Sequence, residues 1–143
     1  MFYKELIDLL RSDQRVSDTV SDFVEQSGTV PAVFSDSAPE AAVFPYITVT
    51  IGKTKQPESV IDLATINIDY WDYDQSRAQA DESAIAVEDL LDLKCMNSEN
   101  FNDIRFSIGN ADYVSQSDSR VIHFNTQFSA RCSRSGWMKR NLQ

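Results

Sequence analysis

The sequence of 143 residues is poor in histidine, cysteine and glycine, and these shortages exclude several kinds of site. His123 is the only histidine, and Cys95 and Cys132 are the only cysteines. The cysteines form no CxxC motif, so they suit free thiols in a reducing compartment better than a zinc site with four ligands. The four glycines lie far apart, which excludes a glycine-rich phosphate-binding loop. We therefore expect no metal and no cofactor.

Long apolar runs and a secretory signal are also missing. No stretch approaches the roughly 18 apolar residues that a membrane-spanning helix requires. The first residues, MFYKELIDLLRSDQ, have neither the basic start nor the apolar centre of a signal peptide. We therefore expect no membrane partner, and we expect the protein to stay in the cytoplasm in which it is made.

Catalytic groups do not occur at useful spacings. His123 and Cys132 are nine residues apart on one predicted strand, so their side chains should point to opposite faces. The acidic stretch DYWDYD at 69–74 lacks the spacing of an EF-hand loop, and SRSGW near the C-terminus lacks the context of a nucleophile elbow. We therefore expect that the protein is not an enzyme and has no catalytic or metal-binding residues.

Charge is distributed unevenly along the chain. Residues 1–118 contain all 22 acidic residues and eight basic ones, a net charge of −14, whereas residues 119–143 carry five basic residues and no acid. The basic end could be a solvated tail, or it could be an arm that docks on an acidic neighbour, such as a second copy of the chain. The acidity of the rest argues against a protein that wraps duplex DNA.

Hydrophobic periodicity predicts two main helices and a sheet. The stretch FYKELIDLLR has a helical apolar stripe. This helix could continue through Val24, or a second short helix could follow after Ser12. An alanine-rich stretch has another stripe, which ends at Leu91. Segments with alternating apolar and polar residues, typical of strands, lie between the two helical stretches and after the second one. In chain order the prediction is a helix within 2–27, strands at 29–36, 44–52 and 63–73, a helix at 75–94, and strands at 104–114 and 120–132.

This order predicts an α+β fold, with a mainly antiparallel sheet of four to five strands and two main helices packed on one face. Pro45 lacks an N–H group and should stand at the start of its strand, and Gly109 indicates a bulge. We expect one domain, residues 1–131, followed by a basic C-terminal arm, residues 132–143. The predicted core contains Ile47, Val49, Ile66, Ile68, Val87, Leu91, Phe124 and Phe128.

Two parts of the chain are candidates for contact with a protein partner. The face of the sheet without helices should carry threonine, asparagine, glutamine, tyrosine and Trp71, a composition suited either to solvent or to an interface. The basic end combines cations with an aromatic residue, which is typical of an anchor that docks. The candidate interface residues are Trp71, Arg131, Arg134, Trp137, Lys139 and Arg140.

The ordered features resemble the tail terminator proteins of long-tailed bacteriophages, also described as minor tail or tail completion proteins. These features are an N-terminal helix, the short strand VPAVFSD, the strand start FPYITVTIG, a strand ending in YWDYD and a helix ending in VEDLLD. The resemblance covers about residues 1–131. The acidic first 28 residues and the basic sequence RCSRSGWMKR depart from the family pattern, so no family contacts are assigned to them.

The resemblance implies a virion structural protein of the tail neck, assembled in the host cytoplasm. It implies a homohexameric ring that caps the tail tube and joins it to a head-side connector or stopper protein. It also implies that DNA passes through the ring without specific binding, past surfaces that should be acidic or neutral. The alternative is another neck component, a head–tail connector or stopper. The family contributes no catalytic residues.

Overall fold

The computed structural model describes residues 2–54, 61–74, 76–98 and 101–134. Most of the segment between the predicted strands at 44–52 and 63–73, and all of the sequence after Arg134, therefore lie outside the described residues. In chain order the elements are α1 (Tyr3–Ser12), α2 (Gln14–Ser17), β1 (Asp22–Glu25), β2 (Gly28–Pro31), β3 (Val33–Ser35), β4 (Tyr46–Thr54), β5 (Ile61–Tyr73), α3 (Ala78–Leu91), β6 (Cys95–Met96), β7 (Phe101–Tyr113) and β8 (Val121–Arg134).

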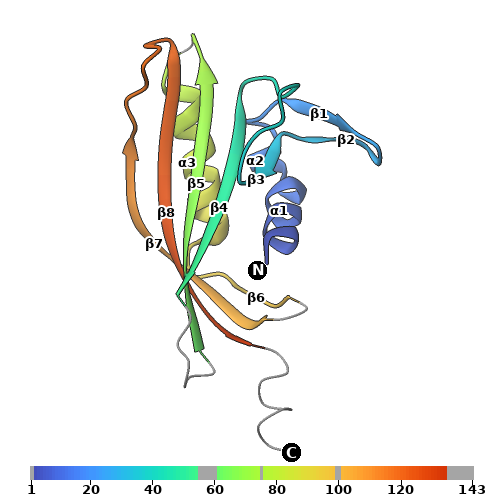
Figure 1. Cartoon of the computed structure of the whole chain (residues 1–143), viewed down its shortest axis with the longest axis vertical. Helices are drawn as coiled ribbons and strands as arrows, with labels where there is room; N and C mark the ends of the chain where they lie inside the picture. Colours follow the sequence, from blue (N-terminus) through green and yellow to red (C-terminus); the bar gives the residue numbers. More distant parts are fainter. Residues whose placement is uncertain (1, 55–60, 75, 99–100, 135–143) are drawn as a thin grey trace, which may run out of the picture.

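A curled sheet of six strands forms the centre of the molecule (Figure 1). Its order is β3-β4-β5-β8-β7-β6, and its pairs are antiparallel except β3 with β4, which run parallel. The predicted α+β class is confirmed, but the sheet is mixed and larger than the four to five strands expected. The additional strand β6 is only two residues long, too short to produce a readable alternation.

Both main helices pack on the same face of this sheet. Buried residues of α1 and α3 belong to one cluster with the inward side chains of β4, β5, β7 and β8. The alanine-rich stripe of α3 lets the helix lie close to the sheet, since small side chains occupy little depth. Seven of the eight predicted core residues are buried, and Phe124 is half-buried at the margin of the cluster.

Of the two alternatives after Ser12, the continued helix is wrong and the second short helix is confirmed as α2, which ends at Ser17 and does not reach Val24. The chain forms only the single turn α2 and then the hairpin β1–β2, which extends to one side of the main sheet (Figure 1). Apolar residues spaced for a helix face can also alternate in a short strand, and here tertiary packing decides. Phe23 of β1 contacts Phe34 of β3 edge to face, with ring centroids 5.0 Å apart. Gly28 follows the turn with φ of 125°, rather than ending a helix.

Two predicted backbone features are confirmed. The strand β4 begins directly after Pro45, and the Phe44–Pro45 peptide is cis. The register between β7 and β8 shifts between Ile108 and Ala111, which is a bulge at Gly109. A Cβ atom at Gly109 would lie 3.0 Å from the carbonyl oxygen of Gln127, so the close approach of the two backbones there favours glycine. Within the described residues, no helix is long and apolar enough to cross a bilayer.

Candidate interaction surface

The face of the sheet opposite the helices is polar and aromatic, and we call it the open face. Residues alternate in and out along β5 and β8, and the register places like-facing residues side by side across the two strands. The open face runs from an aromatic end, near Tyr73, through a polar middle to a basic end, near Arg131. Its residues on β4, β5 and β8 include Tyr46, Thr48, Thr50, Leu63, Thr65, Asn67, Asp69, Trp71, Tyr73, Val121, His123, Asn125, Gln127, Ser129 and Arg131.

A row of stacked rings crosses the aromatic end from β4 to β8. Tyr46 stacks on Trp71 with centroids 6.4 Å apart, and Trp71 stacks on His123 at 3.8 Å with an interplanar angle of 14°. The indole N–H of Trp71 donates to the hydroxyl of Thr48 at 3.1 Å. Thr48, which this bond holds against the indole, is buried although it belongs to the open face. The row therefore presents rigid aromatic surface that costs little side-chain entropy to bury.

A hydrogen-bond network holds the imidazole at the end of this row. Nε2 of His123 lies 2.6 Å from Oδ1 of Asp69, and Nδ1 lies 2.8 Å from the amide nitrogen of Gln116. The neutral tautomer with hydrogen on Nε2 satisfies both contacts, donating to Asp69 and accepting from Gln116. Asn125 also donates to Asp69 at 3.0 Å. The arrangement fixes the ring on which Trp71 stacks, and it contains no nucleophile.

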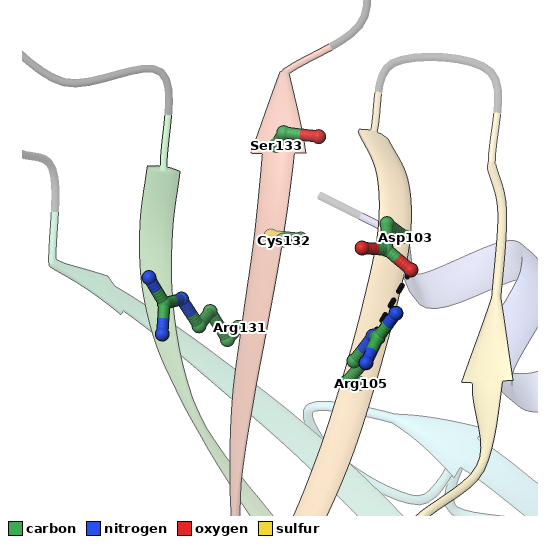
Figure 2. Close-up of a pocket in the computed structure, with 5 residues that line it drawn as sticks. All are labelled: Asp103, Arg105, Arg131, Cys132 and Ser133. Atoms are coloured by element: carbon green, nitrogen blue, oxygen red, sulfur yellow. Dashed lines mark hydrogen bonds and ion pairs between the residues drawn. The ribbon is translucent and has the colours of Figure 1, made fainter.

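The opposite end of the open face is basic (Figure 2). Arg105 of β7 pairs in register with Arg131 of β8, and Leu63 of β5 flanks Arg131 on the other side. Arg105 turns toward Asp103, with Nε 3.1 Å from Oδ1, whereas Arg131 extends across β5. Leu63 is 44% exposed, so an apolar side chain lies beside the arginine at this end. Such a combination of apolar and cationic groups suits a protein partner.

The structure brings together only part of the predicted interface. Trp71 lies half-buried in the aromatic row, and Arg131 lies exposed at the basic end. These two positions face the same side of the sheet at different ends. Arg134 is the last residue of β8, so the strand continues past the expected start of the C-terminal arm. Trp137, Lys139 and Arg140 lie outside the described residues, and their roles stay predictions.

The prediction missed the contacts made by His123 and Asp69. Both residues were recognised as polar sheet residues, but the sequence does not state that β5 pairs with β8 at this register. If the register of β5 with β8 were known, the position of Trp71 opposite His123 would indicate the stacked pair. The hairpin β1–β2 was also missed, together with its exposed Val24.

The predicted separation of the titratable groups is confirmed. Cys132 is buried on the core side, whereas His123 is on the open face, so the two cannot act together. Asp69 faces His123, while Asp72 is buried on the other side of β5. In the part of the chain that the structure describes, no three histidine, cysteine or acidic side chains are grouped to hold a metal ion.

Known proteins share this fold and this sequence pattern. A chain in the solved virion of a native gene transfer agent particle has a TM-score of 0.62 and 18% sequence identity, covering 88% of this chain and 90% of that chain. At this identity the likeness shows the fold alone. No curated protein matches the sequence. Residues 4–133 match the family described as tail completion protein gp17. That match spans most of the sequence, and the chain therefore belongs to the tail completion protein gp17 family, whose members are structural components of a virion tail and not enzymes.

Proposed function

We propose that this tail completion protein is a tail terminator. In this proposal copies of the chain assemble into a homohexameric ring that caps the tail tube and joins it to a head-side connector or stopper protein. DNA passes through the ring without specific binding. The observation that carries the proposal is the family match over residues 4–133, in a chain whose sheet has one face covered by helices and one face open.

The distribution of contact surfaces supports a ring. The hairpin β1–β2 extends to one side of the main sheet and carries Val24, which is 75% exposed (Figure 1). The open face lies elsewhere on the molecule and has a different composition. Two unlike surfaces on one subunit favour a heterologous contact between copies, and heterologous contacts form closed rings when the rotation between copies closes.

The open face also suits a contact with a second protein. Its aromatic row is rigid, and its basic end adds charge that orients a partner. Acidic residues of the tail or head protein that it meets would pair with Arg131, since Arg105 already pairs with Asp103. The role is proposed for the neck region of the virion, after assembly in the host cytoplasm.

The alternative is another neck component, a head–tail connector or stopper, and the test must distinguish it from a tail terminator. Native mass spectrometry of the purified protein gives the number of copies, and we expect six. Co-sedimentation then compares purified tail tubes with portal-capped heads. A terminator binds the tubes, whereas a connector binds the heads. A protein that stays monomeric at micromolar concentration and sediments with neither would refute both roles.

A pair of matched variants tests the open face. Thr65 is exposed in the polar middle of that face, and Ser12 is exposed at the end of α1. Thr65→Arg and Ser12→Arg add the same charge and a similar volume to two exposed hydroxyl positions. We expect Thr65→Arg to weaken assembly or tube binding at least fivefold and Ser12→Arg to leave both unchanged. Equal behaviour of the two variants would exclude the middle of the open face from the interface.

A further inference from the structure

A pocket opens where β5 ends and α3 begins. Its volume is about 490 Å³, within the range of roughly 300–1,000 Å³ typical of ligand sites. The wall is apolar and aromatic on the side of the Phe44–Pro45 turn and polar on the side of α3. The lining residues are Val43, Phe44, Pro45, Asp72, Tyr73, Ser76, Ala78 and Gln79.

Asp72 is the one charged residue in this lining, and it is buried. Its side of β5 faces the core, and only 4% of the residue is exposed. Oδ1 accepts a hydrogen bond from the neighbouring N–H of Tyr73 at 2.8 Å, and within the described residues the carboxylate forms no ion pair. Arg77 and Arg120 lie instead over the rings of Tyr113 and Tyr73. A buried carboxylate without a cationic partner is costly, so a cation that enters the pocket would be stabilised there.

The opposite wall offers a surface for an aromatic side chain. Val43 at the rim is 61% exposed, so its apolar side chain is accessible to a partner. Phe44 stacks on Tyr46 at 5.0 Å and on Tyr73 at 5.6 Å between ring centroids, so its ring is held in place. Gln79 donates its amide to the carbonyl of Thr19 at 2.9 Å, which leaves its side-chain oxygen as an acceptor. The pocket thus fits a segment that carries an aromatic residue next to a cation.

The last nine residues of the chain, 135–143, have this chemistry. They contain Trp137 and Met138 followed directly by Lys139 and Arg140, with no acidic residue. We propose that the pocket binds residues 135–143 of a second copy, with Trp137 against the wall formed by Val43 and Phe44 and a basic side chain at Asp72. This inference rests on the self-assembly in the proposed function and names the contact that would link the copies.

The segment after β8 is too short for Arg140 to reach the pocket of its own copy. The register pairs Tyr73 with Val121, so the pocket lies at the start of β8, and Arg134 lies 13 residues further on at the other end of the strand (Figure 1). The path along β8 is about 43 Å at roughly 3.3 Å per residue. From Arg134, the Cα atom of Arg140 reaches at most about 22 Å, at about 3.6 Å per residue. The cation at position 140 can therefore enter only the pocket of another copy.

Such a contact joins two different parts of two copies. The donor contributes the residues that follow β8 and the acceptor contributes the pocket at the start of α3, so the contact is heterologous and repeats from copy to copy. Charge complementarity between a basic segment and a carboxylate would orient the encounter, and burial of Trp137 would supply much of the affinity.

Photo-cross-linking in the full-length protein tests the proposal. The photoreactive amino acid p-benzoyl-phenylalanine replaces Met138, next to Trp137, and the protein is assembled from equal amounts of ¹⁵N-labelled and unlabelled chains. Mass spectrometry then identifies the captured peptides. We expect cross-links to peptides containing residues 43–45 or 76–79, and we expect them between labelled and unlabelled chains.

Matched variants show whether the pocket is responsible. Val43→Arg places a cation at the rim, and Ser12→Arg places the same cation at an exposed position at the end of α1, outside the surfaces proposed for contact. We expect Val43→Arg to reduce the cross-links at least tenfold and Ser12→Arg to leave them unchanged. Asp72→Asn, which keeps the shape of the side chain, should also reduce them, provided that its urea midpoint shows a folded protein.

Cross-links within one copy, cross-links to other surfaces, or cross-links that Val43→Arg does not affect would overturn the proposal. The mass of the assembly, measured on the same samples without light, is the separate readout for the ring. Intact rings with cross-links elsewhere overturn only the docking of residues 135–143. Absence of rings from the wild-type protein overturns the proposed function as well.

Discussion

Cys95 shows how one neighbouring carboxylate can change the reactivity of an exposed side chain. Its thiol is exposed and donates to Oδ1 of Asp103 at 3.0 Å. This hydrogen bond to Asp103 raises the pKa of the Cys95 thiol, and the interaction lowers the pKa of Asp103 in turn. Since the thiolate is the reactive form, a higher pKa leaves less nucleophile at a given pH.

We therefore expect Cys95 to react slowly with iodoacetamide at pH 8, despite its exposure. Asp103→Asn removes the negative charge and leaves Arg105 in place, so the pKa should fall and the rate should rise several-fold. The measurement is the mass gained by the intact protein over time, with Cys95→Ser as the control, because the buried Cys132 should stay unlabelled. An unchanged rate in Asp103→Asn would mean that Asp103 does not control this thiol.

Two buried hydroxyls make a second prediction possible at this scale. Tyr70 Oη and Thr126 Oγ1 are buried, and neither makes a hydrogen bond of good geometry with a described residue, although the side chain of Thr126 lies beside the Tyr70 hydroxyl. Burial raises the pKa of Tyr70 far above its usual value. Burying a hydroxyl without a good hydrogen bond is unfavourable. Removal of either hydroxyl should therefore not lower the free energy of unfolding.

We expect Tyr70→Phe to leave the free energy of unfolding unchanged or to raise it by up to about 1 kcal/mol. Thr126→Val, which also removes a hydroxyl and nearly conserves the volume, should behave in the same way. Urea unfolding of both variants and the wild type provides the measurement. A loss of more than about 1.5 kcal/mol would show that an ordered water or another group satisfies the hydroxyl.

At the scale of elements, long periodic segments were predictable and short ones were not. The alternation in β5 and β8 and the alanine stripe of α3 repeat over many residues, so sequence alone identifies them. Strand β1 has four residues and β6 has two, which is too few for either period to be distinguished. The parallel pairing of β3 with β4 depends on tertiary packing and leaves no local signal.

The candidate interaction surface was predictable in composition but not in arrangement. Alternation indicated that Trp71 faces away from the core, and the structure confirms this. The stack of Trp71 on His123 requires the pairing of residues more than fifty positions apart, which one sequence does not specify. The same holds for the basic end, where Arg105 and Arg131 meet only through the register of β7 with β8.

The end of α3 offers a test of the core with its own control. Leu91 is fully buried under the sheet, whereas Leu93, two residues later, is 81% exposed. Leu91→Ala should lower the free energy of unfolding by about 2–5 kcal/mol, since it removes buried surface and leaves a cavity. Leu93→Ala should change it by less than about 0.5 kcal/mol. Chemical denaturation checks both, and similar values for the two variants would contradict the packing of α3.

At the scale of the whole molecule, charge is separated between the helical side and the end of the sheet. Exposed acids line α3, among them Asp81, Glu82 and Asp89. The basic end of the open face and the basic residues after it provide the opposite sign. In a ring, the docking proposed above would place the cations of each chain against the carboxylate of the next. The surfaces left over would be mainly acidic, as a channel for DNA requires.

This separation leads to a prediction about DNA. The chain has a net charge of −9, so the wild-type ring should not bind duplex DNA at micromolar concentration in about 150 mM salt. Val43→Arg should displace residues 135–143 from the pocket and free Lys139 and Arg140 to contact phosphates. Binding of a labelled duplex of about 20 base pairs, followed by fluorescence anisotropy, should then increase and fall steeply between about 50 and 200 mM salt.

Ser12→Arg is the control for this experiment, since it adds the same charge at an exposed position at the end of α1. We expect it to resemble the wild type, because one added charge does little to an acidic ring, whereas six released segments present many cations together. Tight, salt-sensitive binding by the wild-type ring would contradict an acidic or neutral channel. Equal gains in both variants would show that the added arginine itself, and not the released segment, contacts DNA.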